Sequence, residues 1–283
     1  MKLLLALAML GLTGGLGALE VPLYRAPGGQ PAIDLQDPQG RSISCIVDSG
    51  AMQTVLSPTL VATGSGRFVG QVHATGAGGS LLLPSWQMEG WRLGEQPLPP
   101  FAALLMDLGN QTPCVLAWAA LGSPRIELDD AGGRLRAAAD LPELAVQLPY
   151  EAVQGFIRLS LPFPGAPDAT LILDTGAGTS VLNRRAGHLL GLDPNRPSNW
   201  VDRRGLDGRV RRHRVHGLAG LPLLPGGTPL TRVEIAELPA LATLGVRADT
   251  PGGLLGADAF RGRRVLIDRQ RQRLELDRSD PLP

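Results

Sequence analysis

A four-residue motif that begins with aspartate occurs twice, at equivalent places in the two halves of the sequence. The first copy comprises Asp48, Ser49, Gly50 and Ala51, and the second comprises Asp174, Thr175, Gly176 and Ala177. Each copy directly follows a short apolar run of the kind that forms a buried strand. Average composition would produce one such motif by chance at roughly one position in 10⁴. The pair therefore predicts a chain of two related units, each with a carboxylate at the end of a strand.

The likeness between the halves extends beyond the aspartates. Residues 31–47 and residues 155–173 are each predicted to form a hairpin whose second strand runs into the motif. Near the end of each copy, residues 125–129 match residues 264–268. The offset between the copies is 126 residues at the aspartates (174 − 48) and 139 at the closing segments (264 − 125). The second copy therefore contains a net insertion of 13 residues (139 − 126).

The composition favours short strands joined by turns. The chain has 283 residues, of which 43% are apolar and only 4% aromatic, and its 37 Gly and 25 Pro follow no collagen-like period. We expect an all-β fold with a minor helix, for which residues 186–190 are the better candidate. The predicted organisation is one unit over residues 18–140, a linker over residues 141–150 and a second unit over residues 151–283.

The N-terminus has the pattern of an export signal. Lys2 is followed by the apolar stretch of residues 3–12 and then by small residues. We predict a signal peptide over residues 1–17, cleaved near Gly17 and Ala18, which would place the mature protein in the periplasm or outside the cell. The alternative is an uncleaved anchor, although about 10 apolar residues are too few for a membrane-spanning helix. After removal of the signal, we expect no integral membrane span.

The charged and metal-ligating residues exclude several classes of function. The formal net charge is +1, so the charge balance gives no argument for binding to nucleic acid. His213 and His216 have a spacing found in some metal sites, but no supporting ligand cluster lies near them in sequence. We therefore expect neither a metal ion nor another cofactor. Cys45 and Cys114 are the only cysteines, and the sequence leaves open whether they form a disulfide or remain two buried thiols.

The doubled motif, followed in each copy by a glycine-bearing hairpin about 30 residues later, resembles the aspartic proteases. Leu-Leu-Gly at residues 254–256 precedes the final hairpin and is similar to a third element of that family. The best match is to two retropepsin-like units fused in one chain, because neither tyrosine falls in a predicted flap. The first copy departs from the pattern, with Ala117 in place of Gly and Ala119 in place of the Asp258 of the second copy. The resemblance implies a bilobal, pseudo-twofold acid-protease fold with one β-barrel lobe per copy.

The resemblance also implies a role for each motif residue. One Asp loop from each lobe would reach the floor of a cleft, where Asp48 and Asp174 would form the catalytic pair. Two adjacent carboxylates cannot both ionise freely, so such a pair holds one proton and can activate a water while it polarises the substrate carbonyl. Ser49 and Thr175 would hydrogen-bond across the pseudo-twofold axis. The glycine of each motif would let backbone amides approach the carboxylates.

The last residue of each motif bears on acidity. Ala51 and Ala177 lack a hydroxyl that could donate to a carboxylate and stabilise its charged form, so we expect a pair less acidic than that of pepsin. The predicted protein is an exported endopeptidase that acts as a monomer on peptide or protein substrates. The alternatives are a catalytically weak or inactive peptide-binding protein of the same fold, a protease with a single target, and two structural Asx turns without catalysis.

Two glycine-bearing turns are candidate flaps that would close over a substrate. The first comprises Thr75, Gly76, Ala77 and Gly78, and the second includes Gly205 and Leu206. Ordinary hairpin turns without substrate contact are the alternative for both. The run from Arg203 to Arg214 is strongly basic, which is compatible with acidic substrates, with a lipid surface, or with the solvated face of a hairpin.

Overall fold

The chain is predominantly β, which confirms the expected all-β class. The computed structural model describes residues 18–61, 66–76, 79–109, 112–193, 195–204 and 210–278. The predicted signal peptide, residues 1–17, lies outside these ranges. Within them, the helical segments are two short α-helices and three short 3₁₀ helices. None of the helices in this part of the chain has the length and hydropathy required to span a bilayer.

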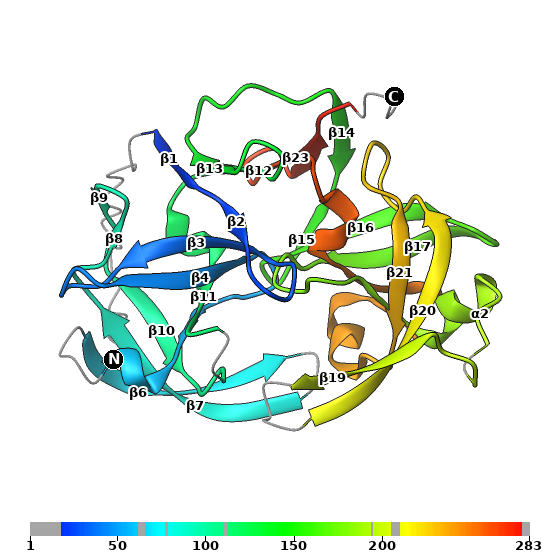
Figure 1. The fold of residues 1–283 in the computed structure, drawn as a ribbon, viewed down its shortest axis with the longest axis horizontal. Coiled ribbons are helices and arrows are strands. Elements are labelled where there is room, and N and C mark those ends of the chain that lie inside the picture. Colours follow the sequence, from blue (N-terminus) through cyan, green and yellow to red (C-terminus); the bar gives the residue numbers. More distant parts are fainter. Residues whose placement is uncertain are drawn as a thin grey trace, which may run out of the picture.

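The strands form three sheets (Figure 1). A six-stranded sheet has the order β1 (Leu19–Pro22), β13 (Arg134–Ala137), β12 (Arg125–Asp129), β23 (Arg264–Asp268), β24 (Arg273–Leu276) and β14 (Val146–Pro149). A ten-stranded sheet has the order β6 (Gly66–Gly76), β7 (Gly79–Met88), β10 (Phe101–Leu105), β5 (Thr54–Leu56), β11 (Cys114–Ala117), β4 (Ser42–Asp48), β3 (Pro31–Gln36), β8 (Arg92–Leu93) and β9 (Gln96–Pro97), with β2 (Tyr24–Arg25) paired to β3. An eight-stranded sheet has the order β15 (Glu151–Val153), β16 (Phe156–Phe163), β17 (Ala166–Leu173), β22 (Gly252–Leu255), β18 (Val181–Leu182), β21 (Leu230–Ile235), β20 (Val210–Leu221) and β19 (Asn199–Arg204).

The two large sheets contain the same three-strand arrangement around the aspartate motif. In the first unit β4 is parallel to β11, and β11 is antiparallel to β5 on its other side. In the second unit β17 is parallel to β22, and β22 is antiparallel to β18. The residues correspond one to one, because Val115 lies opposite Val55 as Leu254 lies opposite Val181. The repeat in the sequence is therefore also a repeat in topology.

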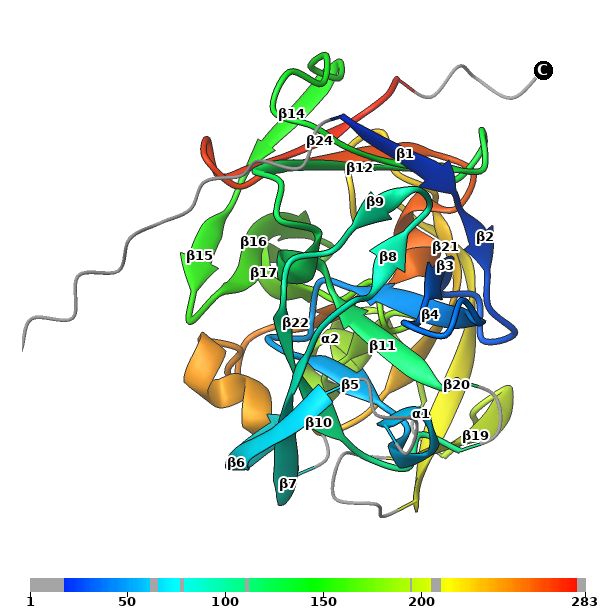
Figure 2. The same cartoon turned by 90° about the vertical axis from the view of Figure 1, so that its left-hand side faces the viewer.

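The six-stranded sheet takes three strands from each half and lies across one end of both large sheets (Figures 1 and 2). The matching segments 125–129 and 264–268 are β12 and β23, which pair with each other in antiparallel register. β1 flanks β13 on one side as β14 flanks β24 on the other. The segment predicted as a linker, residues 141–150, thus contains an outer strand of this sheet. Within this strand, β14, burial alternates only between half-buried and exposed residues, which explains its weak sequence pattern.

The core runs continuously through both units. One cluster of buried side chains extends from the first residues of β1 to β24. Where a strand lies within a sheet and is covered on both faces, its apolar run is uninterrupted, as at residues 171–173 of β17. Where one face meets solvent, burial alternates, as at the end of β3. The apolar runs that precede both aspartates are therefore explained by burial on both faces.

The helices of the described residues are short, and the expected one is among them. Besides α2 (Arg184–Leu189), the helices of the described residues are α1 (Pro58–Val61), η1 (Trp118–Leu121), η2 (Pro239–Leu244) and η3 (Ala257–Phe260). The expected helix is α2, whose first turn is capped by the Asn183 side chain accepting from the Ala186 N–H at 2.9 Å. The predicted hairpin of residues 155–173 is formed by β16 and β17, and Gly165 between them, with a φ of 75°, makes a tight turn possible.

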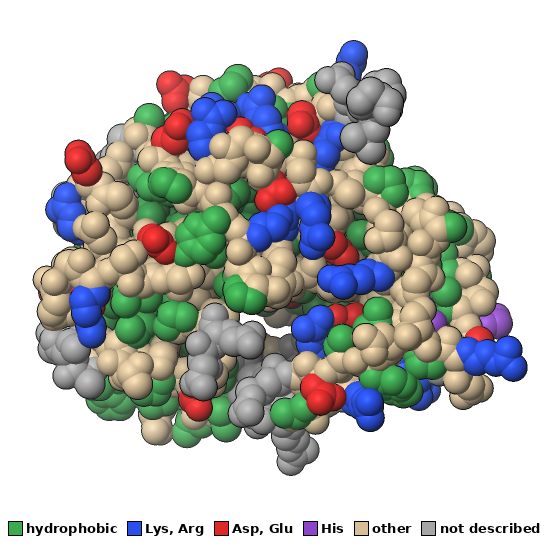
Figure 3. Space-filling model, in the orientation of Figure 1, with side chains coloured by type: hydrophobic (Ala, Val, Ile, Leu, Met, Phe, Trp, Pro, Cys, Tyr) green, Lys and Arg blue, Asp and Glu red, His purple; other side chains and the backbone are tan. Residues whose placement is uncertain are grey.

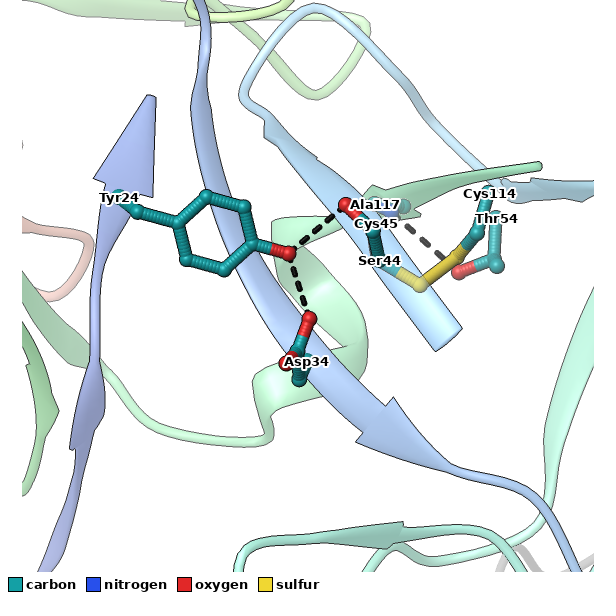
Figure 4. The surroundings of a disulfide bond; sticks show 7 residues. All are labelled: Tyr24, Asp34, Ser44, Cys45, Thr54, Cys114 and Ala117. Carbon is teal, nitrogen blue, oxygen red and sulfur yellow. Dashed lines mark hydrogen bonds between the residues drawn. A yellow bond between two sulfur atoms is a disulfide. The ribbon is translucent and has the colours of Figure 1, made fainter. Parts of the chain in front are cut away.

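Cys45 and Cys114 form a disulfide, which resolves the alternatives left open by the sequence. They face each other on the neighbouring strands β4 and β11, and both are fully buried (Figure 4). Beside the disulfide, the Ala117 N–H donates to Thr54 Oγ1 at 3.3 Å. The bond therefore ties the strand that ends at Asp48 to its neighbour in the three-strand arrangement.

Replacing both cysteines by alanine is expected to lower the free energy of unfolding by about 2–5 kcal/mol. The physical reason is that the unfolded chain is no longer constrained by a cross-link between residues 69 apart. Denaturant unfolding of wild type and of the Cys45→Ala/Cys114→Ala variant measures the loss. Wild type unfolded in a reductant is the control and should match the variant, whereas a loss below about 1 kcal/mol would contradict a stabilising disulfide.

Candidate active site at the boundary of the two units

The two aspartates meet where the large sheets approach each other. Asp48 is the last residue of β4, and Asp174 directly follows β17. Their side chains are partly buried and are hydrogen-bonded to one another. The equivalent topology of the two units thus brings together two carboxyl groups that lie 126 residues apart in sequence (174 − 48).

Reciprocal hydrogen bonds lock the two aspartate loops together. The Ser49 N–H donates to Thr175 Oγ1 at 2.9 Å, and the Thr175 N–H donates to Ser49 Oγ at 3.1 Å. Each hydroxyl also donates to a carbonyl of the opposite strand, Ser49 to Leu173 at 3.1 Å and Thr175 to Val47 at 2.6 Å. Both side chains are buried, so these bonds are not exchanged for bonds to water. The cross-bonds expected for Ser49 and Thr175 are present.

The glycine of each motif is required by close approach to the opposite aspartate. A Cβ on Gly176 would lie 2.3 Å from Asp48 Oδ2, and a Cβ on Gly50 would lie 2.8 Å from Asp174 Cγ. Neither glycine has a positive φ, so the requirement is steric. The same approach supplies donors: Asp48 Oδ1 accepts from the N–H groups of Gly50 at 2.6 Å and Gly176 at 3.3 Å. Asp174 Oδ1 accepts from the Ala177 N–H at 3.0 Å.

The surroundings raise the pKa of both carboxyl groups. For Asp48 the pKa lies well above its usual range, because burial and the neighbouring charge of Asp174 outweigh the amide hydrogen bonds from Gly50 and Gly176. For Asp174 burial also raises the pKa, although hydrogen bonds from the Ala177 amide and from Asp48 oppose the rise. The pair consequently retains a proton at a pH where isolated carboxyl groups have lost theirs.

In the second unit a half-buried carboxylate, that of Asp258, binds the segment that follows the Asp174 loop. Asp258 accepts from the Ser180 N–H at 2.9 Å and from the Ser180 hydroxyl at 2.7 Å. The Ser180 hydroxyl in turn accepts from the Gly256 N–H at 3.0 Å. Gly256, which follows β22, and Asp258 of η3 are thus both bound to Ser180, in the segment that follows the aspartate motif.

The first unit keeps only part of this support. Thr54 takes the place of Ser180 and accepts from the Ala117 N–H at 3.3 Å, but Ala119 offers no carboxylate. The methyl group of Ala117 is accommodated by a different backbone, with ψ of 123° against 176° at Gly256. A Cβ on Gly256 would lie 2.7 Å from the carbonyl oxygen of Ala177. The departure of the first copy from the family pattern is therefore a local change of backbone that leaves the hydrogen bond in place.

A cavity of about 150 Å³ lies beside Asp174. The first unit contributes Gly50 and the hairpin residues Thr75 and Gly76 to its lining. The second unit contributes a mainly apolar wall, formed by Gln154, Phe156, Ile172, Ala240, Leu241, Thr243, Leu244 and Leu254. Asp174 therefore borders a space that suits an apolar side chain.

Most of the insertion in the second copy builds this wall. The offset between the copies is 130 at the equivalent residues Leu104 and Glu234 (234 − 104) and 139 at Val115 and Leu254 (254 − 115). Nine of the 13 inserted residues therefore lie between β21 and β22, where η2 lines the cavity. The sequence revealed the insertion but not its function, because residues without a counterpart in the first copy give no pattern to compare.

The candidate flaps lie at the ends of two hairpins, β6–β7 and β19–β20. Thr75 and Gly76 end β6 and line the cavity. The other predicted flap residues, Ala77, Gly78, Gly205 and Leu206, lie outside the described residues. Both hairpins are found at the side of the molecule opposite the six-stranded sheet (Figures 1 and 2). The surface in Figure 3 has an opening at its centre.

The basic run of the second hairpin is divided between the two faces of its strands. Arg203 and His213 hydrogen-bond to Glu234, which is buried. Arg212 lies on the other face, with its guanidinium 5.3 Å from the centre of the Trp200 ring. The run is therefore not a single basic patch.

The histidines of this hairpin do not assemble a metal site. His213 and His216 are three residues apart on β20, so their side chains point to opposite faces. Throughout the described part of the chain, no group of three or more His, Cys, Asp or Glu side chains could hold a metal ion.

Comparison with known proteins assigns no family to this chain. A scan against protein-family models gives no match, and a search among curated proteins gives no significant match. The chemistry of the site therefore follows from its geometry.

Replacing Asp48 by asparagine is expected to stabilise the protein increasingly as the pH rises. A carboxyl group with a raised pKa in the folded state holds a proton that the unfolded chain has released, so its contribution to stability is lost as the pH rises through that pKa. The amide of Asp48→Asn can donate to Asp174 at every pH. The measurement is the melting temperature of Asp48→Asn minus that of wild type, from about pH 4 to about pH 8. This difference should increase with pH, by about 2–4 °C for each kcal/mol of stability that the wild type loses.

The matched control for this measurement is Asp249→Asn. Asp249 is exposed and paired with Arg247, which lowers the pKa of its carboxyl, so its removal should give no such gain. A difference between Asp48→Asn and wild type that does not change with pH would contradict a raised pKa for the pair.

Replacing Thr175 by valine, which has nearly the same shape, tests the cross-bonds. The change leaves the Ser49 N–H and the Val47 carbonyl without their partner in a buried place, at a cost of about 1–3 kcal/mol for each group. Denaturant unfolding measures the loss. The control is Thr228→Val, which removes one hydrogen bond from the more exposed Thr228 hydroxyl to the Arg261 carbonyl. It should lower the free energy of unfolding by less than about 1 kcal/mol. Equal losses in the two variants would contradict the prediction, because the buried cross-bonds would then add no more stability than one exposed bond.

Proposed function

We propose that this protein is an aspartic endopeptidase with a bilobal, pseudo-twofold acid-protease fold, in which Asp48 and Asp174 activate a water for hydrolysis of a peptide bond. The observation on which this rests is the hydrogen bond between two carboxyl groups that equivalent loops of two related units bring together. The raised pKa values of both groups and the adjacent cavity support the same chemistry. Asx turns with a purely structural role would not account for two carboxyl groups in contact.

The reaction needs one proton shared by the pair. The ionised carboxylate takes a proton from water, and the water oxygen attacks the carbonyl carbon while the protonated carboxyl donates to the carbonyl oxygen. A proton is then delivered to the amide nitrogen, the carbon–nitrogen bond breaks, and an acid and an amine leave. The titration belongs to the pair, so the two roles are not assigned to fixed residues. The amides of Gly50 and Gly176 hold Asp48 in place throughout.

Export to the periplasm or out of the cell is part of the proposal. The pattern of residues 1–17 is that of a signal peptide, and a buried disulfide suits an oxidising compartment. Each unit supplies one aspartate, so a monomer carries the complete pair. The absence of a hydroxyl at Ala51 and Ala177, together with the raised pKa values, supports activity at mildly acidic to near-neutral pH.

The test is cleavage of casein and of a peptide library by the mature protein, with and without pepstatin. Asp48→Asn and Asp174→Asn should each lower the rate by at least about 10²–10⁴-fold, because neither single carboxyl can both accept and donate a proton. Wild-type activity measured from about pH 3 to about pH 8 should peak above about pH 4. Asp249→Asn, far from the pair in sequence and exposed, should leave the rate unchanged. Activity at the wild-type level in either Asp48→Asn or Asp174→Asn would contradict the proposal.

A second candidate is a peptide-binding protein that keeps the cleft but turns substrate over slowly or not at all. The observation that favours it is the incomplete support of the first aspartate loop, where Ala119 replaces the carboxylate of Asp258. Peptide binding by wild type without cleavage at any pH would establish this function. A protease with one target would be inert on casein yet alter a single protein when exported proteins are compared with and without the enzyme.

A further inference from the structure

The cleft-side surface of the first hairpin, β6–β7, is apolar. Val55, Leu83 and Leu104 are buried together, and Val72 and Ala74 of the same surface pack against them. These residues come from β5, β7, β10 and β6, so the cluster crosses the sheet from the aspartate loop to the hairpin.

Strand pairing identifies the equivalent place in the second unit. Val55 and Val181 each follow their aspartate by seven residues (55 − 48 and 181 − 174). Val55 pairs with Leu104 in parallel register, and Val181 pairs with Glu234 in the same way. Glu234 therefore occupies the position of Leu104.

The same comparison places two further charged or polar residues in the second hairpin, β19–β20. Leu104 pairs with Ser85 and Glu234 pairs with Val215, so two residues earlier Leu83 corresponds to His213. One strand further out, Ala74 of the first hairpin corresponds to Arg203 of the second. The register of the paired strands sets these equivalences.

The replacing residues form one hydrogen-bonded cluster, which we call the Glu234 cluster: Arg203, His213 and Glu234. Arg203 Nε donates to both carboxylate oxygens, at 3.1 and 3.2 Å, and His213 Nδ1 lies 3.0 Å from Glu234 Oε2. Glu234 is only 1% exposed, whereas the Arg203 side chain is 46% exposed. Both carboxylate oxygens are thus engaged, and the part of the cluster that reaches solvent is a cation.

The Glu234 cluster lies on the same face of the sheet as the cavity. Residues in register on neighbouring strands share a face. Ile172 pairs with Leu254, Leu254 with Val181, and Val181 with Glu234. Ile172 and Leu254 line the cavity beside Asp174. The row of paired residues that begins with Ile172 at the cavity wall therefore ends with Glu234, a member of the Glu234 cluster.

We propose that the two sides of the cleft select different side chains: an apolar one beside the first hairpin, and an acidic one beside the Glu234 cluster, where Arg203 pairs with it. The inference rests on the proposed function and names its substrate class, a peptide with a Glu or Asp on one side of the bond that is cut. Glu234 sets the position of Arg203, and a substrate carboxylate accepts from the guanidinium in a charge-assisted hydrogen bond. Arg203 is thus a specificity-determining residue.

The chain offers a matched control for charge alone. Arg212 is the neighbour of His213 on β20, but it lies on the opposite face, over the ring of Trp200. A preference for acidic peptides that came from the overall basic charge of the hairpin would respond equally to the loss of Arg212 or Arg203. A preference that comes from the Glu234 cluster responds to Arg203 only.

The experiment uses synthetic peptides that carry Glu or Leu in turn at each position around the central bond. Cleavage by wild type, and binding to Asp48→Asn in which turnover is blocked, give the ratio of Glu to Leu preference at each position. We expect Glu to be preferred by at least about tenfold at one position on one side of the bond, and Leu on the other. Arg203→Gln, which keeps a donor to Glu234, should abolish the Glu preference, while Arg212→Gln should change it less than about twofold.

A second variant tests the converse. Arg203→Ala/His213→Leu/Glu234→Leu copies the residues of the first hairpin and should reverse the preference at that position in favour of Leu. The melting temperature of this triple variant shows whether it is folded. If the triple variant is unfolded, the result for Arg203→Gln alone decides the question. Leu preference at every position, or equal effects of Arg203→Gln and Arg212→Gln, would overturn this inference only. Failure of every peptide to bind or be cut would overturn the proposed function itself.

Discussion

The site depends on the reciprocal hydrogen bonds of Ser49 and Thr175. Each residue gives its N–H to the other's hydroxyl, and each hydroxyl reaches a carbonyl of the strand that enters the opposite loop. Two loops that would otherwise repel each other through their carboxylates are thereby held in contact. The separation of Asp48 and Asp174 is thus set by buried bonds of the backbone rather than by the carboxyl groups. Their shared proton is a consequence of that geometry.

The symmetry of the units is close in the backbone and broken in the side chains. Both units have the same three strands around the aspartate, and both place a hydroxyl behind the loop. Yet one unit alone has the carboxylate of Asp258, the apolar wall of η2 and the charges around Glu234. A peptide has a direction, so a cleft with unlike halves can bind it in one orientation. The differences fall where a substrate would be held, while the shared features fall where the reaction would occur.

The sequence predicts the parts of the molecule that are repeated. The motif, the strands before it and the pairing segments 125–129 and 264–268 were visible because each has a counterpart to compare. Unrepeated parts were not visible: the lining function of η2, the strand within residues 141–150, and the partners of Glu234. The basic run from Arg203 to Arg214 looked uniform in sequence. Its division between two faces follows from strand pairing, which depends on contacts between distant residues.

The pairing of β12 with β23 has a consequence for synthesis of the chain. β12 ends at Asp129, whereas β23 begins at Arg264, so a nascent chain exposes one edge of β12 until a further 135 residues (264 − 129) have emerged. Such an edge is a template for aggregation. Charged residues alternate along it, at Arg125, Glu127 and Asp129, and would protect it during that interval. These three residues, which are buried and form ion pairs in the finished sheet, are thus suited to keep the unfinished one soluble.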